Sequence, residues 1–124
     1  MEIIKNILAV GAGSFIGGAA RYLVSLAMKG IGKGYPWATL AVNLVGCLMI
    51  GLLWGLLSRN AAENTSWGLF LTVGLCGGFT TFSTFSKEAI AMLQTGQMWG
   101  FASYIAISVL AGIALVALGY YIAR

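Results

Sequence analysis

Charge is scarce in this chain of 124 residues, of which 8% are charged and 60% are hydrophobic. A typical soluble domain carries roughly 25% charged residues, which cover a surface that faces water. The scarcity therefore excludes a soluble globular domain, a disordered chain and a nucleic-acid-binding protein. The chain is also too short for more than one domain. We expect residues 1–124 to form a single integral membrane domain.

Histidine is absent, and the only acidic residues are Glu2, Glu63 and Glu88. None of the three lies deep inside a hydrophobic run, whereas proton-coupled transport usually needs a carboxylate or an imidazole within the membrane. The chain also lacks the clusters that supply a nucleophile, a general base or a metal ligand set. Its two cysteines, Cys47 and Cys76, lack CxxC spacing and are interpreted as packing residues. The sequence therefore argues against an enzyme.

Long uncharged runs predict where the chain crosses the membrane. A helix needs about 20 residues to cross a hydrocarbon core of ~30 Å. The sequence predicts an all-α membrane protein with four transmembrane helices, near residues 4–26, 37–57, 67–94 and 98–122. Three tryptophans mark the starts of the last three spans, as aromatic belts mark a membrane surface: Trp37, Trp67 and Trp99. The first span includes Arg21, whose side chain we expect to snorkel toward the surface.

The positive charges give no preferred orientation. Lys5, Arg59 and Arg124 lie on one side of the four spans. Lys29 and Lys33 lie on the other, together with Lys87 if that side chain snorkels. The positive-inside rule needs an excess of Lys and Arg on one side, and here each side carries three. Either one loop dominates insertion, or the chain inserts in both orientations. In the second case, two oppositely oriented copies would form an antiparallel homodimer that reproduces the inverted repeats of larger transporters.

The third span contains a sequence that is unfavourable for a continuous helix. Gly77 and Gly78 are costly in a helix interior, and the threonines that follow prefer to cap a new helix. We predict a break around residues 77–80, with Thr80 or Thr81 capping the second half. Gly77 lies about 15 Å of helical rise beyond Trp67, which is half of a ~30 Å core and so at the midplane. Such backbone is either a kink packed on a neighbouring helix or a binding site, whose freed carbonyls in two copies could ligate a cation.

Polar side chains form a second pattern within the spans. Thr39 and Asn43 share one helix face, and the amide of Asn43 needs hydrogen-bond partners because hydrocarbon offers none. These residues either hold helices together or present a donor to a permeation path.

Aromatic and hydroxyl side chains alternate after the predicted break. Phe82 and Phe85 are three residues apart, and Tyr104 and Ser108 in the fourth span could extend the polar track. Aromatic ring edges carry partial positive charge. Ring edges, hydroxyls and an amide, without a carboxylate, would suit a small anion that sheds its water.

Three segments together resemble the fluoride channels of the CrcB (Fluc) family. They are Gly77-Gly-Phe-Thr-Thr-Phe-Ser-Thr-Phe-Ser86, Thr39-Leu-Ala-Val-Asn43 and Gly17-Gly-Ala-Ala-Arg21. The likeness covers essentially the whole chain. It implies a dual-topology antiparallel homodimer in a bacterial plasma membrane, with two pores that export fluoride passively.

The resemblance also implies roles for individual residues. A structural sodium ion on the dimer axis would be held by the backbone carbonyls of Gly77 and Thr80. Pore roles would fall on Asn43, Phe82, Phe85, Tyr104 and Ser108, with Arg21 near a vestibule. Ala38 and Gly112 depart from the family pattern, because the family usually has glycine at the first position and some members have a hydroxyl at the second.

Two alternatives belong to other functional classes. The chain could be a small scaffold or assembly subunit without a pore, in which the polar residues only join helices. It could also be a small multidrug-type exporter, which the absence of an acidic residue within the first span disfavours.

Overall fold

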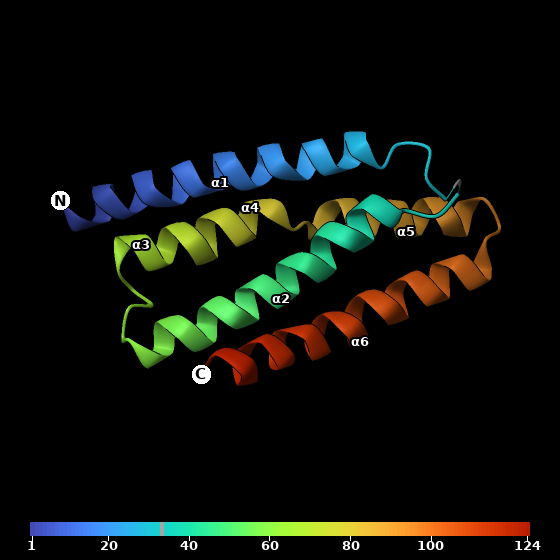
Figure 1. Ribbon diagram of the computed structural model, residues 1–124. Helices are drawn as coiled ribbons and strands as arrows, with labels where there is room; N and C mark the ends of the chain where they lie inside the picture. Colours follow the sequence, from blue (N-terminus) through green and yellow to red (C-terminus); the bar gives the residue numbers. More distant parts are fainter. Residues whose placement is uncertain (33) are drawn as a thin grey trace.

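The computed structural model describes residues 1–32 and 34–124, and every regular element in those residues is a helix. Four segments are long and apolar enough to cross a membrane: α1 (Glu2–Ala27), α2 (Trp37–Arg59), the third segment Ser66–Gln94 and α6 (Met98–Ala123). They form one bundle, and both ends of the chain lie at the same end of it (Figure 1). The four predicted spans are confirmed, each to within two residues. Lys33, which entered the charge tally, lies outside the described residues.

The third segment is divided into shorter helices. It begins as α3 (Ser66–Leu69), continues as the π-helical segment η1 (Phe70–Cys76) and α4 (Gly77–Phe79), and resumes after a break as α5 (Phe82–Gln94). Thr80 and Thr81 form the break between α4 and α5, and both have extended backbone (Figure 1). The Thr81 hydroxyl accepts a hydrogen bond from the Thr84 amide at 3.2 Å, so Thr81 caps α5 as predicted.

The observed break falls at the C-terminal end of the predicted range 77–80, at Thr80 and Thr81. Gly77 and Gly78 are helical, and the break lies just after them. Gly78 is instead required by close packing, because a Cβ there would lie 2.7 Å from the Ser14 oxygen of α1. Gly17 of α1 packs equally closely, since its Cβ would lie 2.8 Å from the Phe79 nitrogen. Small residues at these positions let the two backbones touch.

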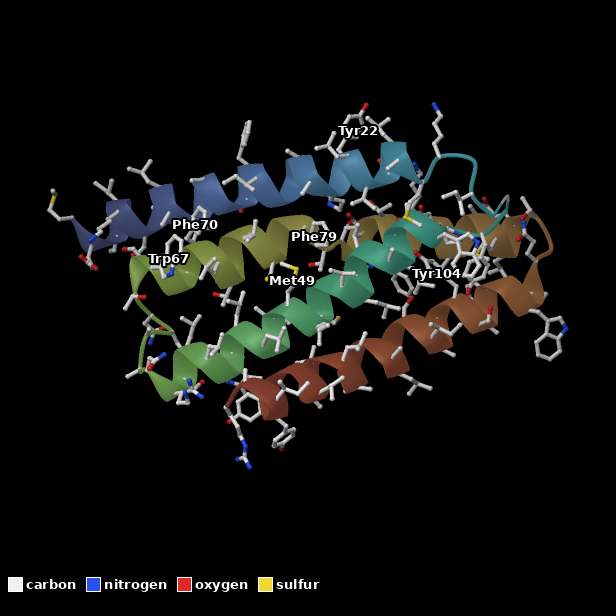
Figure 2. All side chains as sticks on the ribbon, viewed as in Figure 1. Tyr22, Met49, Trp67, Phe70, Phe79 and Tyr104 are labelled. Atoms are coloured by element: carbon white, nitrogen blue, oxygen red, sulfur yellow. The ribbon has the colours of Figure 1, made fainter. Side chains whose placement is uncertain are left out.

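The bundle consists of two closely packed helix pairs. α1 packs along η1 and α4, and α2 packs along α6. In the second pair, a Cβ at Gly55 or Gly119 would lie 2.7 Å from a backbone oxygen of the facing helix. The buried hydrophobic cluster is small and is centred on Tyr104, which points into the bundle, whereas Tyr22 points away from it (Figure 2). Most large apolar side chains face outward, as suits a protein surrounded by lipid or by another copy.

Candidate functional site

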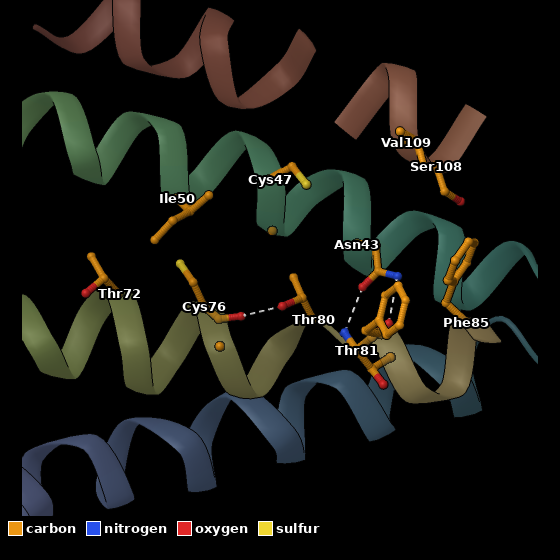
Figure 3. Close-up of a pocket in the computed structure, with 13 residues that line it drawn as sticks. Asn43, Cys47, Ile50, Thr72, Cys76, Thr80, Thr81, Phe85, Ser108 and Val109 are labelled. Atoms are coloured by element: carbon orange, nitrogen blue, oxygen red, sulfur yellow. Dashed lines mark hydrogen bonds between the residues drawn. The ribbon is translucent and has the colours of Figure 1, made fainter. Parts of the chain in front are cut away.

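The side chain of Asn43 binds the backbone at the break in the third segment (Figure 3). Its Oδ1 accepts a hydrogen bond from the Thr81 amide at 2.8 Å, and its Nδ2 donates to the Thr81 oxygen at 3.0 Å. The amide thus supplies Thr81 with both of the partners that a continuous helix would have provided. An asparagine amide carries two N–H donors. One donor of Asn43 therefore remains after both bonds to Thr81 are made.

The break changes the hydrogen bonding of two carbonyls. In a continuous helix the Thr81 amide would donate to the Gly77 oxygen, but here it donates to Asn43. The Thr84 amide would donate to the Thr80 oxygen, but here it donates to the Thr81 hydroxyl. The carbonyls of Gly77 and Thr80 have therefore both lost their helical donors. Carbonyls of unwound helices are the ligands that bind sodium in transporters, so this pair fits the sodium site that the resemblance implies.

Arg21 contacts the same break from α1. Its Nε donates to the Gly78 oxygen at 3.1 Å. This bond directs the half-buried side chain of Arg21 toward the third segment. Arg21 also lines a pocket of about 210 Å³ that includes Ala38, Thr39 and Glu88. The arginine thus places a positive charge beside the broken segment.

A larger pocket, of about 380 Å³, lies on the α2 side of the break (Figure 3). Six of the eight predicted site residues line it: Asn43, Gly77, Thr80, Phe82, Phe85 and Ser108. Cys47 and Cys76 line it as well, although their spacing in the sequence does not connect them. The residues that line this pocket include no acidic side chain. Its polar groups are hydroxyls, thiols, the Asn43 amide and backbone atoms.

Ser108 is distinctive among the residues of this pocket. Within residues 1–32 and 34–124, its Oγ is the only buried side-chain nitrogen or oxygen that has no hydrogen-bond partner. A buried hydroxyl without a partner costs free energy. A polar atom left unpaired beside a cavity is a candidate contact for a bound molecule.

Aromatic rings connect the pocket to the start of α2. The ring centroids of Phe82 and Phe85 are 5.8 Å apart, and those of Phe85 and Tyr104 are 5.0 Å apart. Tyr35 continues the row at 5.8 Å from Tyr104, followed by Trp37 at 4.7 Å from Tyr35. Phe82 is 79% exposed. One copy of the chain therefore leaves this side of the row open.

Tyr104 is fully buried, and its hydroxyl donates to Glu88 Oε1 at 2.9 Å. The single O–H of Tyr104 is thus already used, and its ring is what faces Phe85. Glu88 was not among the predicted site residues, because it lies toward the end of the predicted third span. Glu88 also lines a third pocket, of about 290 Å³, with Tyr35 and Gln97. The short turn between α5 and α6 makes these two helices antiparallel neighbours. This turn could have indicated that Glu88 of α5 lies close to Tyr104 of α6.

The fold and these pockets define a small multi-pass helical membrane protein whose broken third segment lines a largely apolar pocket that contains the Asn43 amide and several hydroxyls. A family model described as "CrcB-like protein, Camphor Resistance (CrcB)" matches residues 8–120. The chain belongs to this family.

Several relatives match the chain over nearly its whole length. A protein of Desulfotalea psychrophila is 41% identical over 124 residues, covering 100% of this chain and 96% of the relative. Proteins of Chlorobaculum tepidum and Phocaeicola vulgatus are each 42% identical over 122 residues, covering 98% of this chain and 97% and 100% of the relatives. All three relatives are named "Fluoride-specific ion channel FluC".

Proposed function

We propose that this chain is the subunit of a fluoride-specific channel that lets fluoride leave a bacterial cell passively across the plasma membrane. The full-length similarity to relatives of that name supports the transported ion. The chemistry of the 380 Å³ pocket agrees with a small anion, because the pocket offers donors and ring edges without a carboxylate. An anion entering it would exchange water for these donors.

The unpaired hydroxyl of Ser108 is the observation that carries this proposal. A fluoride ion passing through the pocket would accept the Ser108 hydrogen and the remaining Nδ2 hydrogen of Asn43. The rings of Phe82 and Phe85 would turn their edges toward the same ion. Tyr104 would act through its ring as a wall of the path, since its hydroxyl is bound to Glu88. Arg21 would attract the anion from the far side of the break.

The working unit in this proposal is an antiparallel homodimer with two pores. The even distribution of Lys and Arg supports insertion in both orientations. The exposure of Phe82 supports a second copy that closes the open side of the path. The freed carbonyls of Gly77 and Thr80 in each copy would hold a sodium ion on the two-fold axis. That ion would supply fixed positive charge and would hold the two broken segments together.

Fluoride efflux from liposomes, followed with a fluoride electrode, tests the proposal through Ser108→Ala. The substitution removes a hydroxyl that makes no hydrogen bond within the described protein, so the melting temperature should stay unchanged. Flux should fall by about 10- to 150-fold, because a hydrogen bond to a charged group contributes about 1.5–3 kcal/mol. Ser58→Ala is the matched control, since it removes a hydroxyl that bonds Glu63 in the loop region, far from the pocket.

Phe82→Ile provides a second variant, because it keeps apolar bulk and removes the ring edge. Slower fluoride flux with unchanged dimer content on size-exclusion chromatography is expected for this variant as well. Wild-type flux in both Ser108→Ala and Phe82→Ile would remove these residues from the path. Wild-type protein that conducts no fluoride would favour the scaffold subunit instead.

A further inference from the structure

The close packing of α2 on α6 brings two arginines from distant parts of the sequence to one end of the bundle. Nη1 of Arg59 donates to the backbone oxygens of Ala123 at 3.4 Å and Arg124 at 3.5 Å. Gly55, one turn before Arg59, allows this approach, since a Cβ there would lie 2.9 Å from the Arg124 nitrogen. The side chains of Arg59 and Arg124 thus share one end of the α2–α6 pair, and both residues are exposed.

Aromatic side chains lie at the same end of the α2–α6 pair. The rings of Trp54 and Tyr120 are in contact at 4.0 Å between centroids, and Tyr121 meets Tyr120 edge-on at 5.1 Å. The guanidinium of Arg124 lies over the Tyr121 ring at 5.1 Å. Trp54 and Tyr121 are 46% and 64% exposed. Such amphipathic rings gather at the depth of lipid headgroups.

The two guanidinium groups of Arg59 and Arg124 lie at this end of the α2–α6 pair. The hydrogen bonds of Arg59 to described residues use Nη1, which leaves the Nε and Nη2 side of its planar fork for another acceptor. Glu63, the acidic residue of the adjoining loop, accepts a hydrogen bond from Ser58 at 2.7 Å. Guanidinium groups bind phosphate through two parallel hydrogen bonds, and basic sites at helix ends bind anionic headgroups.

We infer that Arg59 and Arg124 bind the headgroup of an anionic phospholipid. The phosphate lies on the two guanidinium groups, and the rings of Trp54 and Tyr121 lie at the level of the glycerol. The acyl chains run along the apolar outer face of α6, where Leu118 and Ile122 are 51% and 66% exposed. This site is separate from the pocket around Ser108, which includes neither arginine. The test of lipid binding is therefore independent of the test of fluoride transport.

Native mass spectrometry of the full-length protein, titrated in detergent with phosphatidylglycerol, phosphatidylcholine or inorganic phosphate, tests the site. Wild-type protein should retain phosphatidylglycerol in preference to phosphatidylcholine. Arg59→Gln and Arg124→Gln should each weaken phosphatidylglycerol binding about fivefold, because a basic side chain near a membrane surface contributes about 1 kcal/mol toward anionic lipid. Added salt should weaken binding by the wild type.

Lys29→Gln is the matched control, since it removes one positive charge from an exposed position in the loop that follows α1. It should bind phosphatidylglycerol as the wild type does. Arg124→Gln keeps the test decisive if Arg59→Gln fails to fold, because Arg124 uses its guanidinium only against the Tyr121 ring among the described residues. Equal lipid binding by Arg124→Gln and Lys29→Gln would overturn the site, as would equal retention of the two lipids. Competition by inorganic phosphate at the same concentration would assign the site to free phosphate instead.

Discussion

Gly17 and Gly18 offer a direct test of how α1 is held against the broken third segment. The two glycines are adjacent on α1 and differ in their surroundings. A Cβ at Gly17 would press on the Leu75 carbonyl oxygen and would lie 2.8 Å from the Phe79 nitrogen, whereas a Cβ at Gly18 would meet nothing within 4 Å. Alanine at Gly17 must therefore push α1 away from η1 and α4, while alanine at Gly18 fits.

The free-energy difference between the two alanine variants isolates this packing. Each substitution gains the same helix propensity, up to about 1 kcal/mol. Overpacking at Gly17 should cost about 1–3 kcal/mol, toward the upper end because its neighbours are backbone atoms that cannot rotate away. Gly18→Ala should therefore be at least as stable as the wild type. Gly17→Ala should be less stable than Gly18→Ala by about 1–3 kcal/mol.

The same displacement should be visible in function. Arg21 lies one turn after Gly17, so moving α1 outward lengthens its bond to the Gly78 oxygen and loosens the break. Thermal unfolding in detergent and fluoride efflux from liposomes, measured on both variants, provide the comparison. We expect Gly17→Ala to lose stability and flux together, and Gly18→Ala to keep both. Equal melting temperatures for the two variants would refute the proposed contact between α1 and the broken segment.

Three further predictions follow from the site and the proposed dimer. Cysteine introduced at Asn64 should react with an impermeant thiol reagent on both sides of the membrane in the same cells, and labelling from one side only would contradict dual topology. Replacing sodium by N-methylglucamine should lower dimer content on size-exclusion chromatography if the carbonyls of Gly77 and Thr80 hold sodium, whereas an unchanged dimer would speak against that site. Tyr104→Phe keeps the ring but leaves Glu88 without its donor, so it should lower unfolding stability by about 1–3 kcal/mol, and an unchanged melting temperature would show that this hydrogen bond contributes nothing.

The number and limits of the spans could be predicted from the sequence alone. Hydrocarbon excludes charge, so the positions of a few charged residues and of Trp37, Trp67 and Trp99 bound the helices to within two residues. The threonine cap of α5 was also predictable, because capping depends on residues that are close in sequence. The motif around Phe82 was specific enough to indicate the family that the comparisons then identified.

Only the tertiary structure decided how the polar residues are used. Asn43 is bound at two points to Thr81, and this pairing depends on how α2 meets a segment 38 residues away in the chain. Gly78 is unfavourable in a helix interior by its intrinsic propensity, yet it is helical in the structure. A glycine is needed there because the backbone of α1 packs directly against it. Glu88 and Arg21 also bind partners on other helices. Glu88 accepts a hydrogen bond from the Tyr104 hydroxyl, and Arg21 donates one to the Gly78 carbonyl oxygen. Span limits follow from local hydrophobicity, but the partner of a buried polar group depends on which helices pack together.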